Sequence, residues 1–181
     1  MESDRAAAFD ARVAPHLEDI RRYLFRRTQS LGPGVADGDD LLIEVLATAW
    51  RRLDDLPEGA ELPWLLGVAR RTLANARRRQ QTQHRLVDRL PLPHHAPAAE
   101  QVVVADLALA EALAGLTVSQ REVLELAAFE GLSPAEIAVA LSISVNAASI
   151  RLHRAKQQLR ELLEAKDPDS ARHRDSGGAQ R

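Results

Sequence analysis

The sequence predicts an all-α protein made of two small helical domains joined by a Pro-rich linker, with a helix-turn-helix at the end of the second. Three observations support this prediction. The 181 residues are 45% hydrophobic but only 3% aromatic, which suits helical cores of Leu, Ala and Val. No β-rich stretch appears in the chain. Pro91, Pro93 and Pro97 separate two regions of helical periodicity.

The first domain, residues 1–87, should begin with two helices. The first covers roughly 3–29 and is interrupted at Pro15. The second covers 39–53, where acidic residues suit the positive end of the helix dipole. Its expected core stripe is Leu42, Val45, Leu46, Ala49 and Leu53. Its other faces also carry apolar residues, namely Leu41, Ile43, Ala47 and Trp50. We expect such a helix to be buried within its domain or covered by a partner.

A third helix is expected over residues 63–87, after a loop at 54–62 that contains Pro and Gly. Pro63 suits a first helical position because its fixed φ is already helical. The apolar side of this helix consists of Trp64, Leu65, Val68, Leu73 and Ala76. Its basic side consists of Arg70, Arg71, Arg77, Arg78 and Arg79.

The second domain, residues 101–164, follows a linker at 88–100 that should be extended or mobile. Thr117 and Gln120 have the spacing of a capping box, so a helix should start there. The polar tail at 165–181 is expected to be disordered because it has too few apolar residues to pack.

Residues 131–160 predict two helices joined by a tight turn. Ser133, Pro134 and Glu136 match an N-cap, a first helical Pro and a capping-box Glu. One apolar face of this helix should contain Ile137, Ala140 and Leu141. Ser144 can cap the second helix, whose inward residues should be Ala148, Leu152, Ala155 and Leu159.

The opposite face of that second helix is polar and basic, with Asn146, Ser149, Arg151, His153, Arg154 and Lys156. A helix fits the major groove of DNA with its N-terminal residues against base edges. The alternative is a solvated basic face on an ordinary helical hairpin, because helix-turn-helix geometry also occurs outside DNA binding.

Charge is segregated along the chain, although the net charge is only −2. Residues 69–89 hold 7 Arg against one acid, and 146–166 hold 5 Arg or Lys against 2 acids. The segments 1–68 and 90–145 are acidic, with net charges of −5 and −6. Two separate sites for a phosphate backbone are therefore more plausible than one diffuse patch.

Composition also bears on compartment and chemistry. The chain has no cysteine, which fits a reducing cytoplasm, and no apolar run approaches the roughly 18 residues of a membrane span. We therefore expect a soluble intracellular protein without membrane insertion. Enzyme activity would have to rest on His94 and His95 or on His16 near Glu18. Neither group has a third metal ligand or an activating partner, so no enzyme, metal site or cofactor is expected.

Three runs in order resemble the extracytoplasmic-function (ECF) sigma factors. They are DGDDLLIEVLATAW at 37–50, PWLLGVARRTLANARRR at 63–79, and LTVSQREVLELAAFEGLSPAEIAVALSISVNAASIRLHRAKQQLRELL at 116–163. The resemblance covers roughly residues 9–164. It implies an initiation factor of bacterial RNA polymerase whose first domain opens and reads the −10 element and whose second reads the −35 element. Core polymerase, through its β′ clamp and β flap, and promoter DNA are the implied partners.

The resemblance also implies roles for residues of the first domain. Asp40, Ile43 and Glu44 match the positions that dock on the β′ clamp, with Ile43 where the family usually has Gln. The alternative is that Ile43 packs inside the domain. The implied −10 residues are Leu56, Trp64, Arg70, Arg71, Asn75 and Arg78. Arg71 stands where many members carry Asn, and the alternative for the Arg cluster is solubility.

In the second domain, the implied −35 residues are Asn146, Ser149, Ile150, Arg151, His153 and Arg154. The family usually reads S-x-G-T-V-K-S-R-L where this chain reads SVNAASIRL, so its base contacts do not transfer unchanged and the promoter sequence is not predicted. Ile150 could meet a thymine methyl or pack against the preceding helix.

A stand-alone helix-turn-helix regulator is the alternative function, but it explains only residues 117–164 and leaves 39–87 without a role. The sequence does not reveal an inducing signal or an anti-sigma partner. Cytoplasmic localisation, at the nucleoid when bound to polymerase, is expected from the resemblance.

Overall fold

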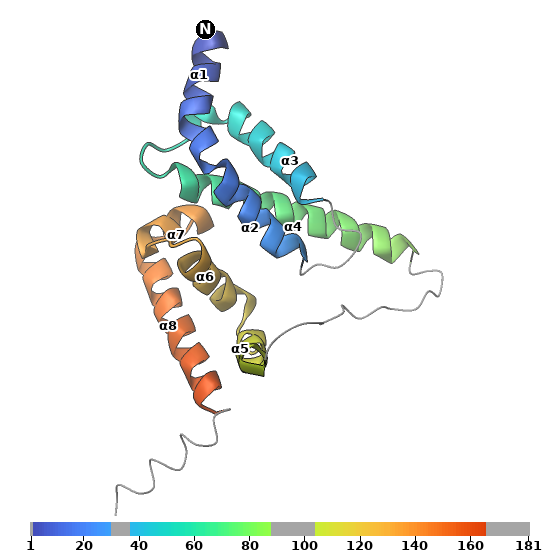
Figure 1. The fold of residues 1–181 in the computed structure, drawn as a ribbon, viewed down its shortest axis with the longest axis vertical. Helices are drawn as coiled ribbons and strands as arrows, with labels where there is room; N and C mark the ends of the chain where they lie inside the picture. The colour runs from blue at the N-terminus through green and yellow to red at the C-terminus, as the bar shows by residue number, and fades with distance from the viewer. Residues whose placement is uncertain (1, 30–36, 88–103, 166–181) are drawn as a thin grey trace, which may run out of the picture. The chain divides into compact units, whose positions relative to one another are not determined.

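A computed structural model describes residues 2–29, 37–87 and 104–165, and all regular elements in these ranges are helical (Figure 1). The all-α prediction is therefore confirmed. The chain forms two compact units: α1 to α4 belong to the first with Glu136–Ile143, and α5, α6 and α8 belong to the second. The predicted linker at 88–100 and almost all of the predicted disordered tail at 165–181 lie outside the described residues.

The first unit begins with α1 (Glu2–Val13), a short 3-10 turn η1 (Ala14–His16) and α2 (Leu17–Gln29). Pro15 lies in the 3-10 turn, so the predicted interruption is confirmed. Proline breaks a helix at this point because it lacks an N–H and clashes with the preceding turn. Buried residues follow the break on α2, with Ile20, Tyr23 and Leu24 at most 1% exposed.

Helix α3 (Gly38–Arg51) starts at Asp37, whose side chain accepts a hydrogen bond from the Asp39 N–H. Its buried stripe consists of Leu41, Val45 and Ala49. The prediction that Leu42 and Leu46 belong to this core was wrong in part, because both are only half-buried. Helix α3 packs against both α2 and α4. The stripe that faces them includes Leu41 in place of Leu42.

After α3, a second 3-10 turn η2 (Leu53–Asp55) and a loop lead into α4 (Glu61–Val87). Helix α4 starts two residues before Pro63 and packs against α1, α2 and α3. Its buried side includes Leu65, Leu66, Val68, Ala69 and Leu73. The basic residues toward its C-terminal half, Arg77, Arg78 and Arg79, are exposed.

In the second unit, α5 (Val104–Ala114) and α6 (Val118–Phe129) pack against α8 (Val145–Glu164). The predicted capping box is confirmed: Thr117 accepts from the Gln120 N–H, and the Gln120 side chain accepts from the Thr117 N–H at 2.9 Å. Apolar side chains from all three helices form the core, including Ala112, Leu116, Val123, Leu126, Ala148, Leu152 and Ala155. Leu159, predicted to point inward, is half-buried.

Helix α7 (Pro134–Leu141) precedes α8 and begins at the predicted proline. It ends with the Ile143 N–H donating to the Ala138 carbonyl at 3.0 Å and the Ser142 N–H donating to the Val139 carbonyl at 3.2 Å. These are the two hydrogen bonds of a Schellman motif. Ser142 has a φ of +55°, a left-handed conformation that glycine adopts more easily. Within the described ranges, no single helix could cross a membrane by length and composition, although α7 and α8 pass that test together as a bent pair.

Candidate functional site

The exposed side of α3 carries an unusual apolar residue. Ile43 is 65% exposed, and Asp40 and Glu44 on the same helix are also exposed. The alternative that Ile43 packs inside the domain was therefore wrong. Since the neighbouring stripe of Leu41 and Val45 faces the core, Ile43 points away from it. Ile43 and the two carboxylates are therefore all accessible to solvent on α3.

The loop between η2 and α4 has one buried residue and an exposed tip. The predicted contact residue Leu56 is only 5% exposed, so its side chain is buried in the core and anchors the start of the loop. Glu58 and Gly59 form the exposed tip. Gly59 has a φ of +74°, and a Cβ at this position would meet nothing within 4 Å. The surface that this loop offers is therefore its tip and its backbone.

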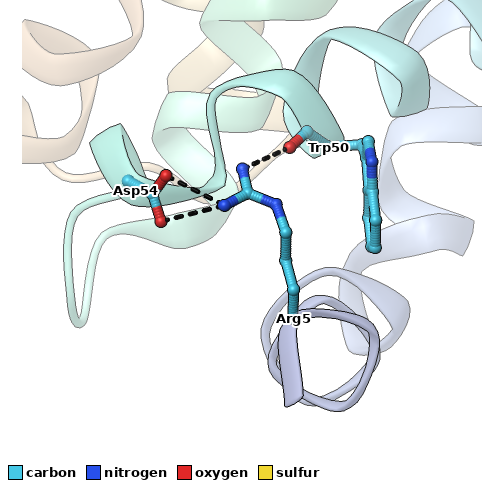
Figure 2. A network of polar contacts seen from close by, with 3 residues as sticks. All are labelled: Arg5, Trp50 and Asp54. Carbon is cyan, nitrogen blue, oxygen red and sulfur yellow. Dashed lines mark hydrogen bonds and ion pairs between the residues drawn. The ribbon is translucent and has the colours of Figure 1, made fainter. Parts of the chain in front are cut away.

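Two arginines of α1 hold this region in place, and no sequence pattern near either residue predicts its contacts. Figure 2 shows the Arg5 guanidinium, which donates to both Asp54 carboxylate oxygens at 3.0 and 3.3 Å and to the Trp50 carbonyl at 3.0 Å. Its guanidinium carbon also lies 5.7 Å from the centre of the Trp50 ring. Arg12 donates to the Leu56 carbonyl at 2.6 Å and to the Glu61 carboxylate at 3.3 Å.

The basic face of α4 lies beside this loop in the sequence. Arg71, Asn75 and Arg78 are exposed and follow one another at spacings of four and three, so they share one side of the helix. Arg70 is half-buried. Partial burial lowers the pKa of Arg71, and the positive charges of Arg52 and Arg70 lower it further. Burial is the larger of these two causes, and the two neighbouring guanidinium groups add positive charge beside Arg71.

The predicted residue Trp64 stands in the first turns of α4 and is half-buried. The guanidinium carbon of Arg52 lies 5.4 Å from the centre of its ring, and Arg52 also forms an ion pair with Asp55 at 2.8 Å. Arg52 was not among the predicted residues. From the C-cap of α3 it contacts both η2, through Asp55, and the first turns of α4, through Trp64.

The second candidate surface is the N-terminal part of α8. Ser144 caps the helix by accepting from the Ala147 N–H at 3.2 Å, as predicted. All six predicted −35 residues are exposed: Asn146, Ser149, Ile150, Arg151, His153 and Arg154. Ile150 is 43% exposed, so the alternative in which it packs away against the preceding helix does not describe this structure. The Ser149 hydroxyl donates to the Val145 carbonyl of its own helix at 2.9 Å.

The predicted residues thus form separate sets. The set on α3, the loop and α4 lies in the first unit, and the set on α8 lies in the second. Within the part of the chain that the structure describes, no group of three His, Asp or Glu side chains could hold a metal ion. The His94 and His95 pair lies outside the described residues.

Comparison with known families matches both halves of the chain. Residues 13–83 match the family model described as Sigma-70 region 2, and residues 106–159 match Sigma-70, region 4. The chain is 31% identical over 153 residues to RNA polymerase sigma factor NccH of Alcaligenes xylosoxydans xylosoxydans, covering 80% of this chain and 82% of that protein. It is 29% identical to ECF RNA polymerase sigma factor SigL of Mycobacterium tuberculosis, covering 90% and 94%.

Solved structures agree on the fold. The structure of CnrH in complex with the cytosolic domain of CnrY matches with a TM-score of 0.55 at 27% identity, covering 90% of this chain and 96% of that one. The sigma factor RpoE in complex with the anti-sigma factor NepR from Bartonella quintana matches with a TM-score of 0.59 at 22% identity, covering 87% and 98%. The chain therefore belongs to the ECF sigma factors and is a promoter-recognising sigma factor of RNA polymerase.

Proposed function

We propose that this sigma factor divides its work between two domains. The first, residues 1–87, binds the β′ clamp of core polymerase and the −10 element. The second, residues 101–164, reads the −35 element and approaches the β flap. The observation that carries the proposal is the separation of the exposed surfaces: an apolar one with carboxylates on α3, and basic ones on α4 and α8.

The polymerase contact is assigned to Asp40, Ile43 and Glu44. Their exposure supports this role, since an Ile that is 65% exposed on a helix with a well-packed opposite face leaves apolar area uncovered. Burial of that side chain against a partner would contribute on the order of 1.5–3 kcal/mol.

The −10 contact is assigned to the loop tip and to Arg70, Arg71, Asn75 and Arg78, with Trp64 supporting the loop. To read a base during strand opening, a protein needs a pocket for an extruded base and cations for the displaced strand. The positive face of α4 supplies the cations, and we assign the base contact to the exposed loop tip that precedes this helix in the sequence. Leu56 takes part only through its backbone and through its support of the loop, because its side chain is buried.

The −35 contact is assigned to α8, with Asn146, Ser149, Ile150 and His153 toward base edges and Arg151 and Arg154 toward phosphates. Because Ser149 carries no charge and its hydroxyl already has a backbone partner, the chain has fewer ion pairs available here than the family pattern provides.

We further propose an anti-sigma protein as a regulatory partner. Two proteins of similar structure support this proposal, because RpoE was solved in complex with the anti-sigma factor NepR and CnrH with the cytosolic domain of CnrY. The chain would act in the cytoplasm, at the nucleoid when bound to polymerase, and without catalytic activity of its own.

Reconstituted transcription tests this proposal against the stand-alone regulator. Fragmented genomic DNA is transcribed by core polymerase with and without the purified chain, and the new transcript starts identify its promoters. We expect specific starts only when both components are present, and no specific binding of those promoters by the chain alone. Tight, specific binding of the duplex by the chain alone, without any effect on start selection by core polymerase, would contradict the proposal.

A further inference from the structure

One side chain holds both ends of the loop between η2 and α4. The Arg12 Nη2 atom lies 2.6 Å from the Leu56 carbonyl oxygen at the start of the loop and 3.3 Å from Glu61 Oε1 at its end. These partners are 44 and 49 residues away in the sequence. One guanidinium nitrogen can make both contacts at once because it carries two N–H donors.

The contact is partly shielded from solvent, because the side chains of Arg12 and Glu61 are only 31% and 17% exposed. Burial alone would raise the pKa of the Glu61 carboxyl, but hydrogen bonds from the Glu61 and Gly59 N–H groups, together with Arg12, hold it below its usual value. Glu61 is therefore ionised at neutral pH. The Glu61 carboxylate thus accepts hydrogen bonds from backbone N–H groups of the loop and also pairs with Arg12.

The tip between these anchors makes little contact of its own. Glu58 and Gly59 are exposed, and no atom lies within 4 Å of a Cβ built at Gly59. The shape of the tip must therefore come from the backbone and from the anchors at its ends, rather than from packing around it.

We propose that Arg12 is a positioning residue that holds Leu56–Glu61 in the conformation that receives an extruded base of the −10 element. This inference rests on the −10 role proposed for the loop. A binding loop discriminates well only if its geometry is preformed, because ordering a mobile loop during binding opposes the gain from the contact. Helix α1 thus acts on promoter selectivity although it contributes no residue to the proposed DNA surface.

Arg5 provides a matched control on the same helix. It lies seven residues, about two turns, before Arg12 and anchors Trp50 and Asp54 to α1. Its hydrogen bonds go to the end of α3 and to η2, not to Leu56–Glu61. Loss of Arg5 should loosen α1 without releasing the two ends of the loop.

The test uses holoenzyme assembled with Arg12→Ala, Arg5→Ala or unchanged sigma, below the unfolding temperature of each. Open-complex formation is measured on the mapped promoter and on a panel in which every −10 base pair is replaced in turn. For Arg12→Ala we expect discrimination to fall about tenfold at one or two adjacent positions, with the other positions unchanged. Arg5→Ala should keep the full pattern of discrimination.

An equal loss at every position with Arg12→Ala, or the same local loss with Arg5→Ala, would show a general structural role and overturn the inference. Arg12→Lys keeps the charge opposite Glu61 but places it on a flexible stem without the rigid planar guanidinium, so we expect it to restore discrimination only in part. If Arg12→Ala does not fold, Glu61→Gln is measured in its place. It keeps an oxygen acceptor but removes the charge, and it should weaken discrimination at the same positions.

A tip variant separates this inference from the proposed function of the loop. Replacing Pro57 and Glu58 together by Gly removes the side chains of the tip and leaves both Arg12 contacts possible. If the tip variant and Arg12→Ala both keep full −10 discrimination, the loop does not read the element and the proposed function fails. If only the tip variant loses discrimination, the loop reads the element and the positioning role of Arg12 is wrong.

Discussion

The guanidinium of Arg79 on α4 lies 3.1 Å from the carboxylate of Glu44 on α3, so one ion pair joins the basic helix to the side proposed to meet polymerase. Both side chains are substantially exposed, at 64% and 47%. Exposed pairs of this kind contribute about 0–1 kcal/mol to stability. The pair can therefore open at little cost when a partner offers Glu44 another cation.

The exposed residue beside this pair gives the first prediction. Ile43→Asp should weaken binding of the chain to core polymerase at least tenfold, because it places a charge where an apolar side chain would be buried. The fold should remain intact by circular dichroism, since Ile43 is 65% exposed. Ala11→Asp, at an exposed position of α1, is the control and should bind normally. Unchanged affinity of Ile43→Asp would place the polymerase contact elsewhere.

Local sequence signals predicted the ends of several helices because the physics at those points is local. Thr117 and Ser144 cap their helices through backbone groups three residues away, and Pro15 interrupts a helix through its own ring. No such local signal marks the end of α7. Ser142 adopts the left-handed conformation there although it is not Gly, and its Cβ makes this conformation sterically unfavourable.

Features that depend on distant partners could not be predicted from the sequence. The core stripe of α3 faces both α2 and α4. Leu41 is therefore buried, whereas the predicted Leu42 and Leu46 are only half-buried. Leu56 was expected at the DNA surface because its loop resembles the base-reading loop of the family, yet its side chain is buried. The contacts of Arg12 span 44 and 49 residues, and nothing near Arg12 in the sequence indicates them.

The second prediction concerns the face of α4 that carries Arg71 and Arg78. If these side chains follow the opened strand, replacing both by Ala should reduce open-complex formation far more on a closed duplex than on a pre-melted bubble. The control replaces Arg22 and Arg160, which are exposed on α2 and near the end of α8, and so removes the same charge away from this face. Equal losses on both templates would indicate simple anchoring of phosphates.

The third prediction uses the lowered pKa of Glu61. A carboxyl whose pKa is lower in the folded state stabilises the fold above its unfolded pKa, about 4.3, and loses this contribution as pH falls through the folded value. Urea unfolding should therefore show Glu61→Gln less stable than the unchanged chain at pH 7. The difference should shrink below about pH 4. A difference that is constant from pH 7 to pH 3 would show that ionisation of Glu61 contributes nothing.

The fourth prediction concerns Ser142 at the end of α7. Ser142→Gly should raise the free energy of unfolding by about 1 kcal/mol, because glycine adopts a φ of +55° without the cost of a Cβ. Thermal or urea unfolding measures the change. Ser142→Ala keeps the Cβ and is the control, with little expected gain. If both variants behave alike, backbone strain at this residue does not limit stability.

The last prediction tests how α8 reads the −35 element. Ile150 follows Asn146 by four residues and precedes His153 by three, so these exposed side chains share one side of the helix. An apolar side chain there suits the methyl group of thymine. In the −35 duplex, each thymine is replaced in turn by uracil, which differs only by that methyl. Holoenzyme should lose affinity about fourfold at one position, the equivalent of about 0.8 kcal/mol for one buried carbon.

With Ile150→Ala, thymine and uracil should bind equally at that position. Val145→Ala, which alters an apolar residue that is 52% exposed on the same helix, should keep the preference. If Ile150→Ala still prefers thymine, residue 150 does not contact the methyl and a different part of α8 faces that base.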